Sequence, residues 1–312
     1  MTAGAHATQR IAYFGKLPGH GDFVRSAGDQ VLVELTDQWL ASVMQRLSAN
    51  PRWRQHYDAC PPLDFAFLGT RTRQVVSGHL LASRDQSARR FPFACMAVHQ
   101  VAEPRSFLPC SPLALAPAWA LLASAAAAAQ PGDSKLPPAL PDLPAARTAL
   151  DDYFAVASVA SLQAQLDGVP VRRLLLALGQ LLAPLRNGAP PPSRCLALPL
   201  PLDATLRAPV AAFWMTLAAP LLARHDLELA LFMAPLGGRP ALVLGLDGAN
   251  PASLQAVIDP EAAPGAMVLL ADSAWVEGTL ASAPALQRLS ACLEQGQLGL
   301  PSAIQLYCET FC

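Results

Sequence analysis

The chain has 312 residues, enough for one large domain or two ordinary ones. Charged residues make up 14% of the chain and its formal net charge is −1, so no electrostatic attraction toward nucleic acid or anionic lipid is expected. Composition therefore argues against nucleic-acid binding and against binding to a charged membrane surface.

Targeting and redox motifs are absent from the sequence pattern. The first ten residues are small and polar, without the apolar stretch of a signal peptide. The most apolar run, residues 208–223, contains two prolines and is shorter than the roughly 20 residues that cross a bilayer, so we expect a buried helix and no membrane insertion. The seven cysteines form no C-x-x-C pair, which argues against a zinc ribbon or a thioredoxin-type site. These features favour a cytoplasmic protein with reduced cysteines.

The first hundred residues are predicted to mix strands with one long helix. A short strand at 11–14 runs into a Gly/Pro turn, and a helix follows over 29–49, with Asp29 at its N-terminal end. The apolar stripe of this helix is predicted to hold Leu32, Leu35, Trp39, Val43 and Leu47, with Trp39 in the core. Residues 63–67 alternate as in a half-buried strand.

Two more strands are predicted at 74–82 and 93–99, since both segments are rich in β-forming residues. Strands this close in sequence favour an antiparallel meander, because a parallel return needs a crossover of a dozen or more residues.

The middle of the chain is predicted to be helical. Residues 113–130 form an Ala-rich helix, and residues 131–144 are too rich in proline for regular structure. Two apolar helices follow at 151–166 and 171–185.

The last third returns to alternating strands and helices. We expect a buried strand at 195–200 and a helix at 209–224, then paired strands at 227–234 and 241–246 around Gly237-Gly238. A helix over 251–258 follows, capped by Asn250, and the chain closes with a helix at 285–292 and a strand at 303–311.

These elements predict an α/β fold, a layered α-β-α sandwich with a mixed or antiparallel sheet and a helical insertion. The expected parts are an N-terminal α/β part at 1–110, an Ala/Pro-rich helical excursion at 111–193, and a C-terminal α/β part at 194–312 that packs on or completes the same sheet.

The most distinctive motif is the segment 14–24, FGKLPGHGDFV. A Gly-rich turn can cradle a phosphate with its backbone N–H groups, so a nucleotide or small-molecule sensor that uses the turn from Gly15 to Gly21 is one interpretation. However, neither G-x-x-x-x-G-K-[ST] nor G-x-G-x-x-G is present. The other interpretation is a tight turn that needs glycine conformations, crowded by charged side chains.

The sequence motifs of metal sites and of nucleophilic catalysis give no positive evidence that this protein is an enzyme. His20 and Asp22 could supply two metal ligands, but no third ligand has partner spacing. No G-x-S-x-G elbow and no Cys/His signature is present, and a hydrolase built from carboxylates of distant segments remains a third alternative. We therefore predict no catalytic residue, no metal and no cofactor.

A second motif, DQSARRFPF at 85–93, lies between two predicted strands. One interpretation is a polar hairpin loop, with Pro92 marking the start of the next strand. In the other, Asp85 forms a fixed pair with Arg89 or Arg90 and leaves one guanidinium free for a carboxylate or phosphate of a partner.

Together the two motifs resemble the TagF family of type VI secretion-associated proteins. The family pattern F-G-K-L-P-x-x-G-D-F is matched by residues 14–23, and D-x-x-G-R-x-F-P-L is approached by residues 85–93. The second motif has Ala88 where the family has glycine and Phe93 where it has leucine, which questions a glycine-specific turn there. The resemblance covers about residues 11–100.

The resemblance implies a non-enzymatic accessory protein of a type VI secretion system. Such proteins look like post-translational repressors that engage a cytosolic forkhead-associated-domain scaffold, beside a kinase/phosphatase switch. No phosphatase domain is expected here, because the residues after 193 lack Asp-rich metal motifs.

The predicted site combines both motifs. The residues expected to contact a partner are Lys16, His20, Asp22, Arg25, Asp85, Arg89 and Arg90. Those expected to shape the turns are Gly15, Pro18, Gly19, Gly21, Phe91 and Pro92.

Overall fold

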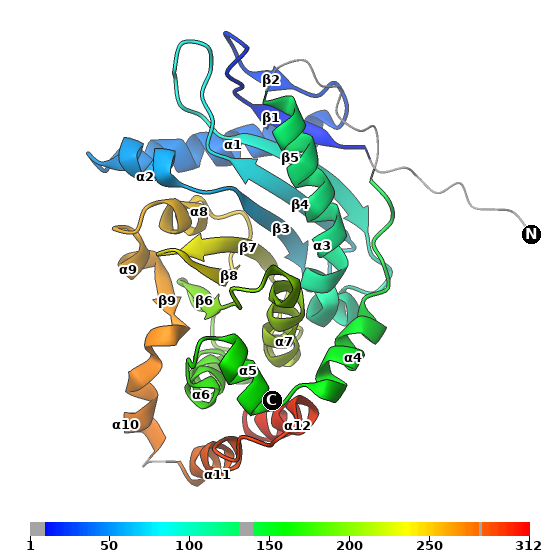
Figure 1. Cartoon of the computed structure of the whole chain (residues 1–312), viewed down its shortest axis with the longest axis vertical. Coiled ribbons are helices and arrows are strands. Elements are labelled where there is room, and N and C mark those ends of the chain that lie inside the picture. The colour runs from blue at the N-terminus through cyan, green and yellow to red at the C-terminus, as the bar shows by residue number, and fades with distance from the viewer. Residues whose placement is uncertain (1–9, 131–139, 281–282) are drawn as a thin grey trace, which may run out of the picture.

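The computed structural model describes residues 10–130, 140–280 and 283–312 and is built on one central sheet (Figure 1). Nine strands form this sheet in the described residues, in the order β2-β1-β5-β4-β3-β7-β8-β6-β9. All neighbours pair antiparallel except β6 and β9, which are parallel. The strands are β1 Ala12–Gly15, β2 Val24–Arg25, β3 Leu63–Gly69, β4 Gln74–Leu81, β5 Phe93–Gln100, β6 Cys195–Pro199, β7 Glu228–Leu236, β8 Arg239–Gly245 and β9 Met267–Leu269. Helices cover both faces, so the predicted α-β-α sandwich with a mixed sheet is confirmed.

Sheet pairing follows the short connections in the sequence. The meander β3-β4-β5 and the hairpin β7-β8 are both antiparallel, as predicted. β3 also pairs with β7, with Phe65 opposite Phe232, so strands from before and after the helical middle belong to one sheet. The three-residue strand β9 was not predicted.

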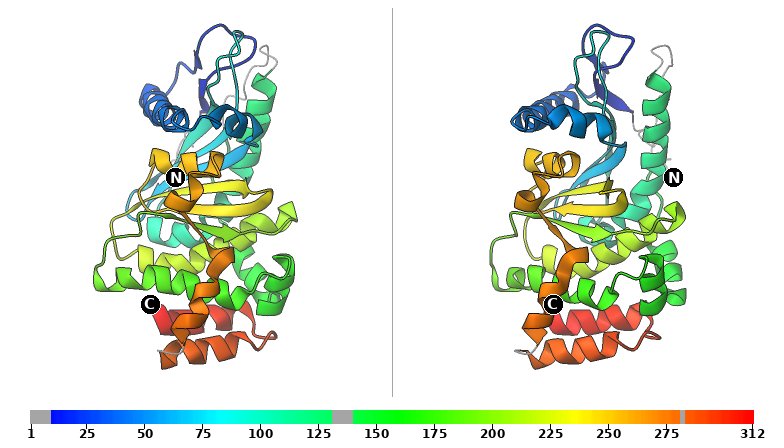
Figure 2. Two further views of the ribbon diagram at one scale, coloured as in Figure 1. Left: turned by 90° about the vertical axis from the view of Figure 1, so that its left-hand side faces the viewer. Right: turned by 60° about the vertical axis from the view of Figure 1, so that its left-hand side comes forward.

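One face of the sheet carries α1 Gln30–Leu47, α2 Trp53–Ala59, α8 Pro251–Ile258 and α9 Ala263–Ala266, as Figure 2 shows. Asp29 caps α1, with its Oδ1 accepting the N–H of Leu32 at 3.2 Å. Trp39 is 6% exposed and packs against Phe65, which confirms its predicted place in the core. Leu35 is 58% exposed, so its predicted burial is wrong. Val33, Thr36 and Leu40 are buried beside the other predicted residues, so the buried face lies on the side of the stripe away from Leu35.

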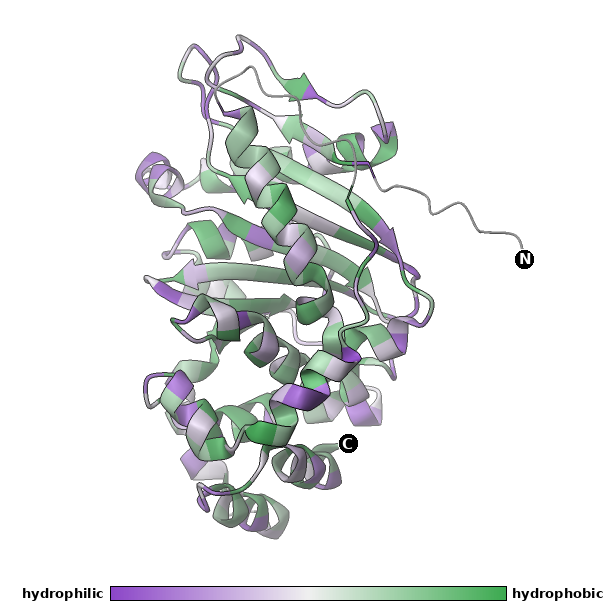
Figure 3. Cartoon of the chain, turned by 45° about the vertical axis from the view of Figure 1, so that its right-hand side comes forward, coloured by the Kyte–Doolittle hydropathy of each residue, from purple (hydrophilic) through white to green (hydrophobic). Residues whose placement is uncertain are grey.

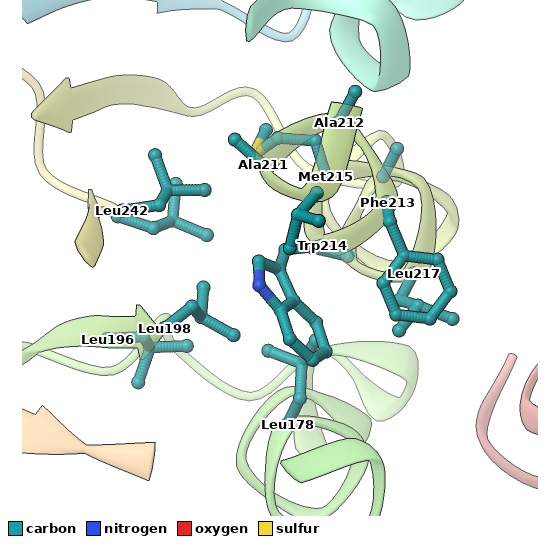
Figure 4. Packing of buried hydrophobic residues seen from close by; sticks show 14 of the residues in the cluster. Leu178, Leu196, Leu198, Ala211, Ala212, Phe213, Trp214, Met215, Leu217 and Leu242 are labelled. Atoms are coloured by element: carbon teal, nitrogen blue, oxygen red, sulfur yellow. The ribbon is translucent and has the colours of Figure 1, made fainter. Parts of the chain in front are cut away.

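The other face carries α3 Pro104–Ala129 and α7 Ala204–Leu222, with further helices packed behind them toward the end of the molecule that holds residue 312. These are α4 Arg147–Val156, α5 Val159–Gln165, α6 Val171–Leu182, α10 Val276–Leu280, α11 Pro284–Leu293 and α12 Leu300–Phe311, with 3-10 turns at Ala183–Asn187 and Leu270–Trp275. Figure 4 shows Trp214 of α7 between Leu178 of α6 and sheet residues such as Leu198, all fully or almost fully buried. Its Nε1–H donates to the Pro199 carbonyl at 3.0 Å.

Several predicted element boundaries are wrong. α3 begins at Pro104 rather than at 113, although three prolines lie inside it. Proline disfavours a helix interior because it removes a backbone hydrogen bond, and here burial of the apolar side chains of α3 outweighs that cost. Similarly, α7 begins at Ala204 rather than at 209, capped by Asp203, whose side chain accepts the Thr205 N–H.

Two further predictions about local structure are wrong. The predicted helix at 151–166 is two helices, and Ser158 caps the second through a capping box with Ser161. The predicted strand at 303–311 is α12, because its buried residues Ala303, Tyr307 and Phe311 recur every four positions.

The alternation in residues 63–67 predicted a half-buried strand, but Ala66 is as fully buried as Phe65. Helices cover both faces of the sheet, so buried residues occur in both alternating sets, while Asp64 and Phe67 are half-buried. Of the proline-rich stretch 131–144, residues 131–139 lie outside the described residues, as do residues 1–9 of the polar start.

Within the described residues, α3 and α7 are long and apolar enough to cross a membrane by length and composition alone. Half of the most apolar window of α3 and 61% of that of α7 are buried inside the protein. Burial against the sheet and the helices behind it therefore accounts for much of their apolar character.

Candidate functional site

The two sequence motifs form a pair of loops at one end of the molecule (Figure 1). One loop, residues 16–23, joins β1 to β2, and the other, residues 83–91, lies between β4 and β5. The Ser83 hydroxyl donates to the Lys16 carbonyl at 2.6 Å, and the Gln86 N–H donates to the His20 carbonyl at 2.9 Å. These loops, named the loop pair below, are one structural unit.

Asp85 is the centre of the loop pair. Its buried carboxylate accepts four hydrogen bonds: from Lys16 Nζ at 2.9 Å, from Arg89 Nε at 2.7 Å, and from the N–H groups of Ser87 and Arg89 at 2.9 Å each. Burial raises the pKa of the Asp85 carboxyl, but the hydrogen bonds from Lys16 and Arg89 outweigh it and hold the pKa well below its usual range. The carboxylate is therefore ionised whenever the protein is folded near neutral pH.

Lys16 is buried with Asp85. Its ammonium lies 4.9 Å from the centre of the Phe23 ring, a cation–π arrangement. Phe23 stacks on Phe14 at 5.4 Å and meets the edge of Phe91 at 4.9 Å. The buried ion pair of Lys16 and Asp85 therefore holds the two loops together. Neither side chain is accessible to a partner.

The two arginines of the second motif are both paired. Arg89 forms the predicted pair with Asp85, and its Nη2 also donates to the Gly21 carbonyl at 2.7 Å. Arg90 holds both carboxylate oxygens of Asp58 in α2, at 2.7 and 2.6 Å. The interpretation that leaves one of these guanidinium groups free is therefore wrong, because Asp58, which the sequence did not indicate as a partner, pairs with Arg90. The Arg89 side chain nevertheless remains 60% exposed.

Backbone conformation explains two positions of the motifs. Gly15 has φ of 138°, and a Cβ there would lie 2.0 Å from the carbonyl oxygen of Pro92, so only glycine fits between the strands. Ala88, which replaces the glycine of the family pattern, has φ of 61°. The left-handed turn is thus retained without glycine.

The remaining site residues differ in exposure. Pro18, Gly19, Gly21, Asp22 and Arg25 are exposed. The Asp22 Oδ1 accepts its neighbour's N–H, that of Phe23, at 2.8 Å, and Arg25 makes no ion pair among the described residues. His20 is half-buried, and its Nδ1 is a buried atom without a hydrogen-bond partner in the described part of the chain.

Sequence reasoning missed two residues of this surface. Phe23 lies inside the first motif, and its aromatic ring could have been identified as the contact of Lys16. Arg84, exposed in the second loop, acts on the same carboxylate as Arg90. The hydrogen bond from Arg90 is the main cause that lowers the pKa of Asp58, and the charge of Arg84 lowers it further.

Two polar clusters lie within the sheet, and each contains a histidine. Asp64 Oδ1 contacts His79 Nδ1 at 2.6 Å, and His79 is directly opposite Cys95 on the next strand. Cys95 is fully buried, and burial raises the pKa of its thiol to about 12, so it is not an activated nucleophile.

The second cluster is Ser77 and His99, whose Oγ and Nε2 lie 2.7 Å apart. Both residues are fully buried, and burial lowers the pKa of His99 to about 4. Among the described residues, no three His, Cys, Asp or Glu side chains are grouped to hold a metal ion.

Both loops lie within a segment that matches a known protein family. Residues 12–140 match the TagF N-terminal domain, described as type VI secretion system-associated, and this range includes both loops and α3. The chain is thus a type VI secretion system-associated protein. Its residues 12–140 carry a TagF N-terminal domain, as the two motifs indicated.

Other similarities are weaker. The crystal structure of PA0076 from Pseudomonas aeruginosa PAO1 aligns with 43% of this chain at 24% sequence identity and a TM-score of 0.35. The aligned part spans 64% of that protein. No curated protein matches the chain significantly.

Proposed function

We propose that this protein is a non-enzymatic accessory protein that binds other proteins of the secretion machinery through the exposed surface of the loop pair. The observation that carries the proposal is the Asp85 centre: its hydrogen bond from Lys16 joins two loops that are distant in sequence, and its other three hydrogen bonds fix the second loop. Side chains on a fixed backbone lose little conformational freedom when a partner docks, which favours recognition.

The exposed groups give this surface its chemistry. Asp22, Arg25, Arg84 and Arg89 all carry charge and are solvent-exposed on or beside the loops. Only 14% of the chain is charged, so a cluster of charges on rigid loops is unusual for this protein. Charged side chains at the rim of an interface chiefly set association rate and specificity.

The proposal includes a partner, an effect and a location. The partner is a cytosolic scaffold with a forkhead-associated domain, the effect is post-translational repression of secretion, and the protein acts in the cytoplasm. Support for these finer points comes from the family resemblance of the two motifs. The geometry favours protein binding over nucleotide binding, because the Lys16 ammonium is used internally by Asp85.

The test is an Asp22→Ala, Arg25→Ala double variant of the full chain. Both side chains are exposed, so we expect the melting temperature to stay within a degree or two of the unaltered protein. Binding to the purified scaffold should weaken at least about tenfold, and repression of secretion in cells should weaken with it.

The matched control is Arg288→Ala, which removes an exposed arginine of α11 at the opposite end of the molecule. It should leave both melting temperature and binding unchanged. A folded double variant that binds the scaffold like the unaltered protein would rule out this surface.

A further inference from the structure

A cavity lies on the α3 and α7 face of the sheet, away from the loop pair. It has a volume of about 630 Å³ and is bounded by α3, by the first turns of α7 and by strands β3, β7 and β8. Its volume lies within the roughly 300–1,000 Å³ of pockets that hold small molecules. The lining residues that matter here are Asp64, Trp119, Ala120, Leu202, Arg207 and Met233.

The walls of this cavity are mainly apolar. α3 contributes Trp119 and three alanines, Ala116, Ala120 and Ala123, and no residue of α3 after Arg105 is charged. Figure 3 shows α3 lying across the sheet, with apolar and weakly polar colours along most of its length. The small alanine side chains of α3 leave room for the cavity, and Met233 of β7 lines its sheet side.

One carboxylate interrupts these apolar walls. Asp64 projects from β3, its side chain is 30% exposed, and among the described residues it is the only acidic one that lines the cavity. The Nδ1 of His79, which is itself buried, holds its Oδ1 at 2.6 Å. A carboxylate that is fixed at one oxygen keeps acceptor positions at the other, because an ionised carboxylate offers about four lone-pair sites.

Among the described residues, Arg207 is the one Lys or Arg that lines the cavity, and it does not pair with Asp64. The guanidinium of Arg207 donates to the Pro201 carbonyl at 3.2 Å and to the Leu202 carbonyl at 2.7 Å, both on the rim. No salt bridge between Arg207 and Asp64 is present among the described residues. The cavity therefore offers an oriented anion within apolar walls.

We propose that this cavity binds a small organic cation, an ammonium or guanidinium group carried on an apolar body. The cationic group would donate to Asp64, and the apolar body would lie against Trp119, Met233 and the alanines of α3. A carboxylate paired with a positive donor forms the stronger class of hydrogen bond. This inference is independent of the proposed function, because none of the residues involved belongs to the loop pair.

The probe is 4-phenylbutylamine, with 4-phenylbutan-1-ol as its uncharged match. Titration calorimetry on the full chain should detect the amine with a dissociation constant on the order of a millimolar, as its size allows. The alcohol should bind at least about tenfold more weakly. Asp64→Asn should abolish this preference, because it removes the charge and keeps the shape of the side chain.

A wall-filling variant keeps the test decisive if Asp64→Asn fails to fold. Both positions on α3 are exposed, but Ala120→Leu adds three carbons to a residue that lines the cavity, whereas Ala127→Leu adds them to one that does not. Ala120→Leu should lose amine binding and Ala127→Leu should retain it. Equal binding of amine and alcohol by the unaltered protein, or equal amine binding by the two leucine variants, would overturn the proposal.

Discussion

Replacing Ala88 with glycine should stabilise this protein. Ala88 is exposed in the second loop and has φ of 61°, a left-handed conformation that costs an L-residue about 1–2 kcal/mol. Glycine removes that cost, but its greater freedom in the unfolded chain returns about 0.5–1 kcal/mol. No packing is lost at an exposed alanine, so the net gain in unfolding free energy should be about 0.5–1 kcal/mol.

Urea denaturation followed by circular dichroism measures this difference as a higher midpoint with an unchanged slope. The control is Ala127→Gly, the same chemical change at an exposed position of α3. There glycine should cost about 1 kcal/mol, because the alanine is helical. If Ala88→Gly destabilised the protein as much as the control, the turn would not have the left-handed geometry on which the loop pair depends.

Three further predictions concern the core and the loops. Gly15→Ala should lower the melting temperature strongly and speed the hydrogen exchange of the amides that pair β1 with β5, because the new Cβ would lie 2.0 Å from the Pro92 carbonyl oxygen. Exchange rates equal to those of the unaltered protein would contradict this. Trp39→Ala should cost about 3–5 kcal/mol in urea denaturation, since Trp39 is almost fully buried, and an unchanged midpoint would refute its place in the core. His99 has a folded-state pKa of about 4, below its ordinary value of 6.5, so its contribution to stability is complete above pH 6.5 and is lost as the pH falls toward 4. That loss should reach about 3 kcal/mol and should be missing from the pH profile of His99→Asn; parallel profiles would show that His99 does not titrate with unfolding.

Much of the fold could be predicted because its signals are local. The antiparallel meander and the β7-β8 hairpin follow from short connections, and the burial of Trp39 follows from helical spacing. The secondary-structure predictions failed where tertiary packing, rather than local sequence, determined the conformation. The proline-containing start of α3 is helical because it packs on the sheet, and 303–311 is helical because its apolar residues face α6 and α7.

For the site, the sequence by itself identified both motifs and the family to which they belong. It also offered Arg89 or Arg90 as the partner of Asp85, and the structure selects Arg89, four residues away. Only the tertiary structure decided that Lys16 reaches Asp85 across 69 residues and that Arg90 binds Asp58. The physical reason is that the free energy of a charge depends on its burial and on its nearest opposite charge, and both are set by strands that meet in space. The charged motif residues look equally polar in the sequence, yet the fold buries Lys16 and Asp85 in an ion pair and leaves Asp22 and Arg25 exposed to solvent.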